Sequence, residues 1–239
     1  MTKIIELKDA ERYYEMGEGI VKALDGVDIS IEKGDFIAIM GPSGSGKSTS
    51  MNLTGSLDLA TKGEIYLDGE NIAEMEESEL AQIRGKKIGF IFQQFNLIPN
   101  LTTKENVMLP MLFQQQDEEE RRERAEELLK DVDLGDRMDH YPNQLSGGQQ
   151  QRVAIARALA NKPEVILADE PTGNLDTKTG DKMMNFLTDL NKKGRTIIIV
   201  THDPDLAKKY AKKIYSIKDG KIEYVYNKIR DKWIKKQAH

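Results

Sequence analysis

Short apolar runs, separated by turns and by longer polar stretches, make up most of this chain. Four of these runs have the length of a strand: residues 36–40, 87–92, 165–168 and 196–200. Mostly apolar runs of this length are typical of strands that are buried on both faces of a parallel sheet. Stretches of helical length lie at residues 49–56, 150–160 and 177–192. Because these stretches alternate with the apolar runs, the pattern predicts an α/β fold with a mostly parallel core sheet flanked by helices.

The N-terminal region has a different pattern. Residues 3–8 alternate loosely between apolar and polar side chains, residues 27–31 alternate strictly, and residues 63–69 resemble a strand that ends in an Asp-Gly turn. Residues 12–15 are expected to lie between strands. Strands and turns of this kind predict a small N-terminal antiparallel β subdomain beside the parallel sheet. Near the other end of the chain, the Lys-Asp-Gly-Lys sequence at 218–221 predicts a hairpin between two further strands.

A helical insert is predicted at residues 95–145. Residues 117–131 carry Glu and Arg four positions apart, at Glu118–Arg122 and Glu120–Arg124, a spacing that supports an exposed helix. We therefore expect one domain with four segments: core segments 1–94 and 146–226, the insert 95–145, and a C-terminal tail 227–239. Residues 228–236 are basic with interleaved apolar positions, for which a solvated terminal helix is favoured over contact with anionic lipid or a partner.

The amino-acid composition is typical of a soluble globular protein and excludes several kinds of site. The chain has 239 residues, of which 38% are hydrophobic and 31% are charged, as expected for one soluble α/β domain. A formal net charge of −5 gives no indication of a nucleic-acid-binding surface. The absence of cysteine excludes disulfides, thiolate metal sites and cysteine nucleophiles. With no apolar run of about 20 residues and no signal-peptide pattern, the chain is expected in the cytosol.

The loop after the first buried strand matches the phosphate-binding pattern GxxxxGK[ST]. Its residues, here called the phosphate loop, are Gly41, Pro42, Ser43, Gly44, Ser45, Gly46, Lys47 and Ser48. A strand before it and a helix from Thr49 after it complete the context that the motif requires. Glycines let successive N–H groups point at a polyphosphate, and the helix N-terminus adds its positive dipole end. Lys47 is expected to contact the β- and γ-phosphates of a nucleotide and Ser48 to ligate Mg²⁺, with Thr49 included in the nucleotide site.

Two alternatives to this interpretation are weaker. One is a Gly/Ser-rich surface turn, which would not require every fixed position of the motif. The other is a dinucleotide-binding GxGxxG loop, but Thr49 stands where the third glycine belongs.

Polar residues at the ends of two buried strands supply the candidate chemistry. Asp169 follows four apolar residues and is expected to anchor Mg²⁺, while Glu170 is placed to activate water for attack on a γ-phosphate. His202 ends the strand at 196–200 in the same way. Such residues belong at the carboxyl edge of a parallel sheet, where α/β proteins bind ligands. From position alone, a surface Asp-Glu pair and a structural histidine remain open as alternatives.

A second motif points to a family. The sequence Leu-Ser-Gly-Gly-Gln at 145–149, here called the signature, is followed by Gln-Gln-Arg-Val-Ala-Ile-Ala-Arg-Ala-Leu. With the phosphate loop, it resembles the ATP-binding subunit of ABC transporters over nearly the whole chain. This resemblance implies a P-loop NTPase fold of ABC type. It also implies that the protein hydrolyses ATP. It also assigns Tyr14 to adenine stacking, with Tyr13 as the competitor, and His202 to a switch role.

Other roles are also implied by the resemblance. Gln93 is similar to the family's Q-loop glutamine, which contacts Mg²⁺ and water. Residues 174–176 resemble the D-loop, with Asp176 at the nucleotide and Asn174 as a mild departure. In the family, two copies pair head-to-tail, so that each ATP lies between one phosphate loop and the partner's signature. That partner site would be formed by Ser146, Gly147, Gly148 and Gln149, at a helix N-terminus that attracts anions.

Residues 89–97 and 168–176 most resemble the macrolide-export, lipoprotein-release and cell-division group of ATPases. This similarity implies an integral membrane permease as partner and a peripheral position at the cytoplasmic face of the membrane. Residues 95–113 are unusually apolar and are predicted to couple the chain to that partner, with packing between the insert and the core as the alternative for some of them. Two other hypotheses are a soluble ABC ATPase of DNA repair or translation and a regulator without turnover. The lack of a zinc-binding cysteine pattern and of a second nucleotide domain argues against a soluble ATPase. The complete set of Asp169, Glu170 and His202 argues against a regulator without turnover.

Overall fold

The computed structural model describes residues 2–17 and 19–237. It contains two compact units. The first unit consists of Met1–Leu80 and Leu187–His239, and the second unit of Ala81–Phe186. Helices α2 (Glu77–Lys87) and α6 (Thr177–Lys192) each have residues in both. In the part of the chain that the structure describes, no helix is both long and apolar enough to cross a membrane.

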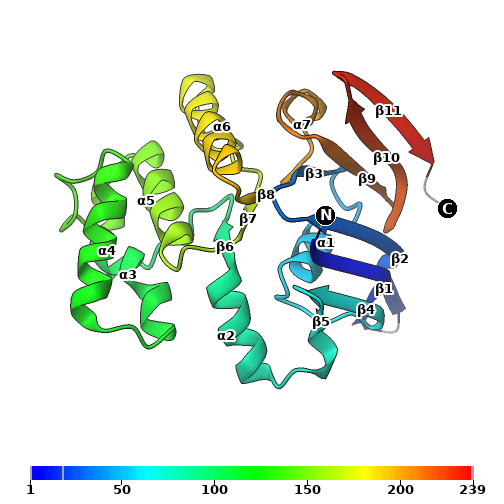
Figure 1. Cartoon of the computed structure of the whole chain (residues 1–239), viewed down its shortest axis with the longest axis horizontal. Coiled ribbons are helices and arrows are strands. Elements are labelled where there is room, and N and C mark those ends of the chain that lie inside the picture. Colours follow the sequence, from blue (N-terminus) through cyan, green and yellow to red (C-terminus); the bar gives the residue numbers. More distant parts are fainter. Residues whose placement is uncertain (1, 18, 238–239) are drawn as a thin grey trace. The chain divides into compact units, whose positions relative to one another are not determined.

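The first unit contains the predicted antiparallel sheet. It has the order β2-β1-β4-β5, and β1 pairs antiparallel with both β2 and β4 (Figure 1). Its strands are β1 (Lys3–Met16), β2 (Gly19–Glu32), β4 (Lys62–Leu67) and β5 (Glu70–Asn71). The expectation that residues 12–15 lie between strands is wrong. They belong to β1, which continues past register shifts near Ala10 that a short sequence pattern does not reveal.

The remaining strands of the first unit lie in the order β11-β10-β9-β3-β8. Strand β3 pairs parallel with both β8 and β9, and β10 pairs antiparallel with β9 and β11. Every residue of β8 is buried, which explains its continuous apolar sequence. The elements are β3 (Phe36–Met40), α1 (Lys47–Thr54), η1 (Ile72–Glu74), β8 (Thr196–Thr201), α7 (Pro204–Tyr210), β9 (Lys213–Lys218), β10 (Lys221–Ile229) and β11 (Lys232–Gln237).

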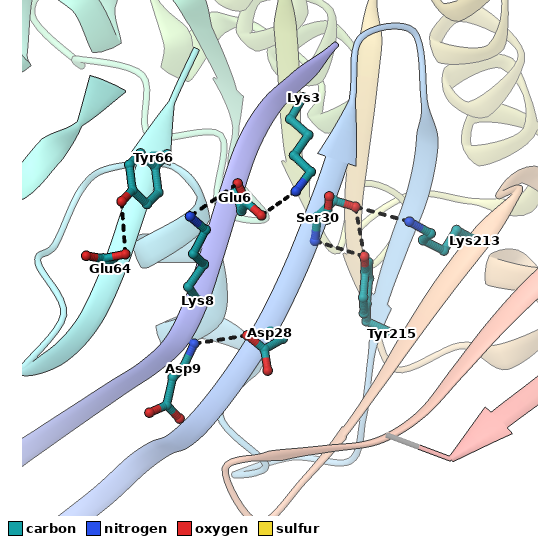
Figure 2. A network of polar contacts seen from close by, with 10 residues as sticks. All are labelled: Lys3, Glu6, Lys8, Asp9, Asp28, Ser30, Glu64, Tyr66, Lys213 and Tyr215. Atoms are coloured by element: carbon teal, nitrogen blue, oxygen red, sulfur yellow. Dashed lines mark hydrogen bonds and ion pairs between the residues drawn. The ribbon is translucent and has the colours of Figure 1, made fainter. Parts of the chain in front are cut away.

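The two sheets of the first unit are joined through the backbone of Ser30 on β2. The Tyr215 hydroxyl donates to the Ser30 carbonyl oxygen at 2.8 Å and accepts from its N–H at 3.0 Å (Figure 2). The Lys213 ammonium donates to the same carbonyl oxygen at 3.1 Å. Both side chains come from β9, which pairs with β3, so these bonds hold the antiparallel sheet beside the strand that leads to the phosphate loop.

Two hairpins end the chain. The predicted one at 218–221 is confirmed: Asp219 and Gly220 have φ of 48° and 75°, as a type I′ turn requires. Arg230 and Asp231 also have positive φ and reverse the chain into β11. The favoured terminal helix over residues 228–236 is therefore wrong. Aromatic and β-branched side chains interleaved with lysines favour a strand pair here.

The second unit combines a parallel strand pair with helices. Strands β6 and β7 pair in parallel, and α5 packs on β6 so closely that a Cβ at Gly89 would lie 2.2 Å from the carbonyl oxygen of Ala158. Helix α2, which the sequence did not predict, has Leu80 as its buried residue and so lacks a clear apolar stripe. The elements are β6 (Ile88–Ile91), α3 (Thr103–Phe113), α4 (Glu118–Asp131), η2 (Pro142–Gln144), α5 (Gly147–Leu159) and β7 (Val165–Asp169).

The predicted charged helix is present as α4, but its ion pairs have a different spacing. Arg122 pairs with Glu119 and Arg124 with Glu127, three positions apart instead of four. Both spacings place side chains on one helix face, and rotamers select between them. The prediction of an exposed helix holds, whereas the predicted partners were wrong.

Candidate functional site

The phosphate loop connects β3 to α1 in the first unit. Gly44 and Gly46 have φ of 76° and 102°, in the left-handed region that glycine adopts without strain. Gly46 caps α1 without a side-chain hydrogen bond, and the first turn of α1 carries no acidic residue. The Lys47 ammonium donates to the Pro42 carbonyl oxygen at 2.8 Å and thus folds back over the loop. A positive side chain and a helix N-terminus therefore converge on one short turn, as an anion site requires.

Close packing explains why glycine occupies two positions of this loop. A Cβ at Gly41 would lie 2.2 Å from the carbonyl oxygen of Ile217, and one at Gly46 would lie 2.4 Å from that of Ala23. The Gly220 N–H supports the loop by donating to the Ser45 carbonyl oxygen at 3.0 Å. The hairpin signal at Asp219-Gly220 was visible in the sequence, but its contact with the phosphate loop was not.

Tyr14 lies beside residues that follow α1. Its hydroxyl donates to the Asp58 carboxylate at 3.1 Å, and the Arg12 guanidinium carbon lies 4.8 Å from the centre of its ring. Arg12 and Asp58 form an ion pair of 2.9 Å. Arg12 and Asp58 were missed in the sequence because 46 positions separate them and no motif contains them.

Tyr13 has a different set of partners. Its hydroxyl donates to the Asp25 carboxylate at 2.9 Å, and a hydrogen bond with Glu11, together with burial, raises the pKa of Tyr13. Bonds from Tyr13, Lys221 and Lys22 lower the pKa of Asp25 from its usual 3.8 to about 2. Tyr13 is thus held in a polar network of its own.

His202 follows β8 directly and is exposed. The next residue, Asp203, caps α7: its carboxylate accepts from the N–H groups of Asp205 and Leu206 at 2.8 and 3.1 Å. The strand end and the helix cap therefore fix the backbone on both sides of the histidine.

Gln93, Glu170 and Asn174 are brought together in the second unit. Asp169 is the last residue of β7, and Glu170 follows with a φ of 42°, a conformation that non-glycine residues rarely adopt. The Glu170 carbonyl oxygen accepts from the Gly173 N–H at 2.9 Å, which closes a tight turn. The Asn174 amide donates to the Gln93 carbonyl oxygen at 2.8 Å. The residue that departs from the frequent D-loop form thus ties this loop to the Q-loop.

Asp176 caps the N-terminus of α6. Its carboxylate accepts from the Thr179 hydroxyl at 2.6 Å and from the Thr179 N–H at 3.1 Å. These hydrogen bonds lower the pKa of Asp176. The side chain therefore has a structural task within its own loop.

The signature forms the N-terminus of α5. Ser146 and Gln149 build a capping box, in which the Ser146 N–H donates to the Gln149 side-chain oxygen at 2.8 Å and the Gln149 N–H donates to the Ser146 hydroxyl at 3.4 Å. The helix begins at Gly147, three residues before the predicted start, so both glycines lie in its first turn. Ser146 and Gly147 are exposed and Gly148 is half-buried.

The predicted site residues thus fall into two sets, each described within its own unit. The first unit holds Tyr14, the phosphate loop, Thr49 and His202. The second unit holds Gln93, the signature, Asp169, Glu170 and Asp176.

Comparison with known proteins places this arrangement in a family. Residues 24–173 match the family model described as ABC transporter. An ABC transporter ATP-binding protein of Methanocaldococcus jannaschii is 55% identical over 94% of this chain and 100% of its own length. A macrolide export ATP-binding/permease protein, MacB, of Hyphomonas neptunium is 52% identical over 92% of this chain, which spans only 34% of that protein.

A solved structure agrees with the sequence matches. It is the dimeric, post-hydrolysis state of a second M. jannaschii ATP-binding cassette, bound to ADP and phosphate. It superimposes with a TM-score of 0.87 at 51% identity and covers 93% of this chain and 98% of the cassette. The chain therefore belongs to the ABC transporter family, as an ATP-binding and ATP-hydrolysing subunit.

Proposed function

We propose that MgATP binds with its phosphates on the phosphate loop. The amide N–H groups of the loop and the α1 N-terminus face the polyphosphate, and Lys47 adds a full positive charge. Ser48 and Asp169, with help from Gln93, are the residues that would hold Mg²⁺, and such an ion would neutralise charge on the phosphate oxygens. The left-handed glycines and the close packing at Gly41 and Gly46 support this fit, because they shape a cradle of backbone amides.

Tyr14, and not Tyr13, stacks on the adenine in this proposal. The hydrogen bond from the Tyr14 hydroxyl to Asp58 supports this choice, because it places Tyr14 beside the segment that follows α1. Tyr13 is instead engaged by Asp25, on which Lys22 and Lys221 also converge.

Glu170 acts as the general base that accepts a proton from the attacking water, and His202 contacts the γ-phosphate. The strained backbone at Glu170 is consistent with this role, since unusual conformations persist where the surrounding structure enforces them. The Asn174 contact to Gln93 links the Q-loop to the turn that carries the base.

Two copies of the chain pair head-to-tail and enclose two nucleotides. Ser146, Gly147, Gly148 and Gln149 of one copy present the N-terminus of α5 to the γ-phosphate bound by the other. The exposed position of Ser146 and Gly147 and the dimeric state of the similar M. jannaschii cassette support this pairing.

The dimer drives an integral membrane partner of the export type, from the cytoplasmic face of the membrane. The similarity to MacB, whose name joins ATP-binding and permease functions, supports this subgroup. Exposed apolar side chains in residues 95–113 offer a surface for the partner: Ile98 (39% exposed), Leu112 (50%) and Phe113 (65%).

The phosphate loop is the observation that carries the proposal, and Lys47→Ala tests it. Without the ammonium group, MgATP affinity measured by calorimetry should fall below detection, and steady-state phosphate release should stop. Lys192→Ala, which removes a lysine that is 70% exposed, is the matched control and should behave like the parent. Parental ATP affinity in Lys47→Ala would remove the loop from the binding site.

A further inference from the structure

A cavity of about 340 Å³ lies in the second unit behind the signature. Its walls come from helix α5, helix α6, and the end of α4 with the two residues that follow it. None of its lining residues belongs to the phosphate loop, and its rim includes Ser146 and Gly148. The volume is at the lower end of the range for small-molecule sites.

Gln151 is the polar group that distinguishes this cavity. It lines the wall and is only 3% exposed, yet its side-chain nitrogen has no hydrogen-bond partner among the residues that the structure describes. Buried amide groups almost always have partners, because leaving one without a partner costs stability. The nitrogen of a side-chain amide is a donor, so its natural complement is an acceptor such as the carbonyl oxygen of a ligand amide.

The rest of the wall favours an uncharged molecule with an apolar body. Five apolar side chains line the cavity: Val132, Ile155, Leu175, Met183 and Phe186. The charged residues cancel, since Asp131 and Asp133 are matched by Arg152 and Lys182. Arg152 is further fixed by donating to the carbonyl oxygens of Val132 and Asp133 at 3.1 and 3.4 Å.

We propose that this cavity is a regulatory site for a small, uncharged molecule with a flat apolar body and a primary amide or lactam. The carbonyl oxygen of the ligand amide accepts a hydrogen bond from the Gln151 side-chain nitrogen, and the apolar body of the ligand lies against Met183 and Phe186. Since α5 begins with the signature and α6 follows the D-loop, occupancy shifts both elements and changes ATP turnover. The regulatory effect rests on the proposed function, whereas binding does not.

Binding is tested without nucleotide, with 2-naphthamide as the probe and the full-length chain as the receptor. Ligand-observed NMR gives affinity, and the ¹⁵N side-chain signals of Gln151, assigned by their loss in Gln151→Leu, report contact. We expect 2-naphthamide to bind at least tenfold more tightly than 2-naphthoate, which replaces the amide by a carboxylate. Gln151→Leu should weaken binding at least tenfold, whereas Gln237→Leu, at an exposed position on β11, should not.

Phe186→Trp is a second test that keeps the amide. It fills part of the cavity and should also weaken binding at least tenfold, so the site remains testable if Gln151→Leu does not fold. Equal affinity of both variants and the parent, or a cavity that takes up only water and no probe, would overturn the site.

Turnover gives the regulatory readout. Saturating 2-naphthamide should change kcat for ATP at least twofold with KM unchanged in the parent, and leave Gln151→Leu unaffected. Binding without any change in kcat would overturn regulation but leave the site. A parent that hydrolyses no ATP but still binds the probe would contradict the proposed function alone.

Discussion

At the scale of residues, two neighbouring tyrosines have different contacts although they differ by only one position in the chain. Tyr13 and Tyr14 are adjacent in β1, so their side chains point to opposite faces of the sheet. Tyr13 donates to Asp25, and Tyr14 donates to Asp58. The family resemblance assigns adenine stacking to Tyr14 with Tyr13 as the competitor, and the sequence alone does not separate the two. The choice depends on partners 12 and 44 positions away.

Alanine substitutions separate the two tyrosines. Tyr14→Ala should weaken ATP binding by about 1–3 kcal/mol, the range for a base stacked on an aromatic ring. Tyr13→Ala should leave ATP affinity nearly unchanged and lower the thermal stability instead. Calorimetric titration with ATP and thermal unfolding measure both effects. The opposite distribution between the two variants would assign adenine stacking to Tyr13.

Asp25 predicts a pH dependence of folding. Its hydrogen bonds to Tyr13, Lys221 and Lys22 lower its pKa from 3.8 to about 2 in the folded chain. A carboxylate with a depressed folded-state pKa stabilises the fold above its unfolded pKa, and that contribution is lost as pH falls from about 4 to about 2. Urea unfolding across this window should show a smaller loss of stability with falling pH for Asp25→Asn than for the parent. Identical slopes would show that the ionised carboxylate contributes nothing.

At the scale of elements, helix α5 connects the signature to the Q-loop segment. The Arg157 guanidinium, near its C-terminal end, donates to the carbonyl oxygens of Phe95 and Asn96, and burial lowers the pKa of Arg157. A shift of α5 at the signature therefore reaches residues 95–96 directly. These two hydrogen bonds would connect the proposed partner-coupling surface to a nucleotide bound at the signature.

Phe113 tests that coupling surface better than the half-buried Leu97. Phe113→Asp places a charge on a side chain that is 65% exposed at the end of α3, so folding and basal ATPase activity should be unchanged. Stimulation of the ATPase by the membrane partner, reconstituted in vesicles, should fall at least tenfold. Glu119→Arg, a charge change on the exposed face of α4, serves as the control. Undiminished stimulation in Phe113→Asp would exclude this surface.

The sequence predicted those strands whose residues are nearly all buried. The runs that became β3, β6, β7 and β8 are apolar because both faces of these strands are covered. Helix α2 and strand β11 escaped prediction because many of their residues are charged, so neither shows a clear apolar pattern, although the partner of β11 is the adjacent strand β10. The full length of β1 was also missed, because bulges break its alternation.

At the scale of the whole molecule, the sequence motifs predicted more about function than the hydrophobic periodicity did. The phosphate loop and the signature indicated the family, which the comparisons show. The division into segments 1–94, 95–145, 146–226 and 227–239 stays a prediction. The roles of individual residues in binding and hydrolysis also stay predictions, since they concern a nucleotide and a second copy that one sequence does not contain.

Glu170→Gln tests the central claim most directly. The substitution keeps the size of the side chain but removes its charge and its proton acceptor, so ATP hydrolysis should fall by about 10²–10⁴-fold. ATP binding should remain, because the phosphate loop and Asp169 are unchanged. With hydrolysis blocked, the head-to-tail pair should persist, so ATP should convert the variant, but not the parent, into a stable dimer on a sizing column. Hydrolysis at the parental rate, or a variant that stays monomeric with ATP bound, would contradict the account.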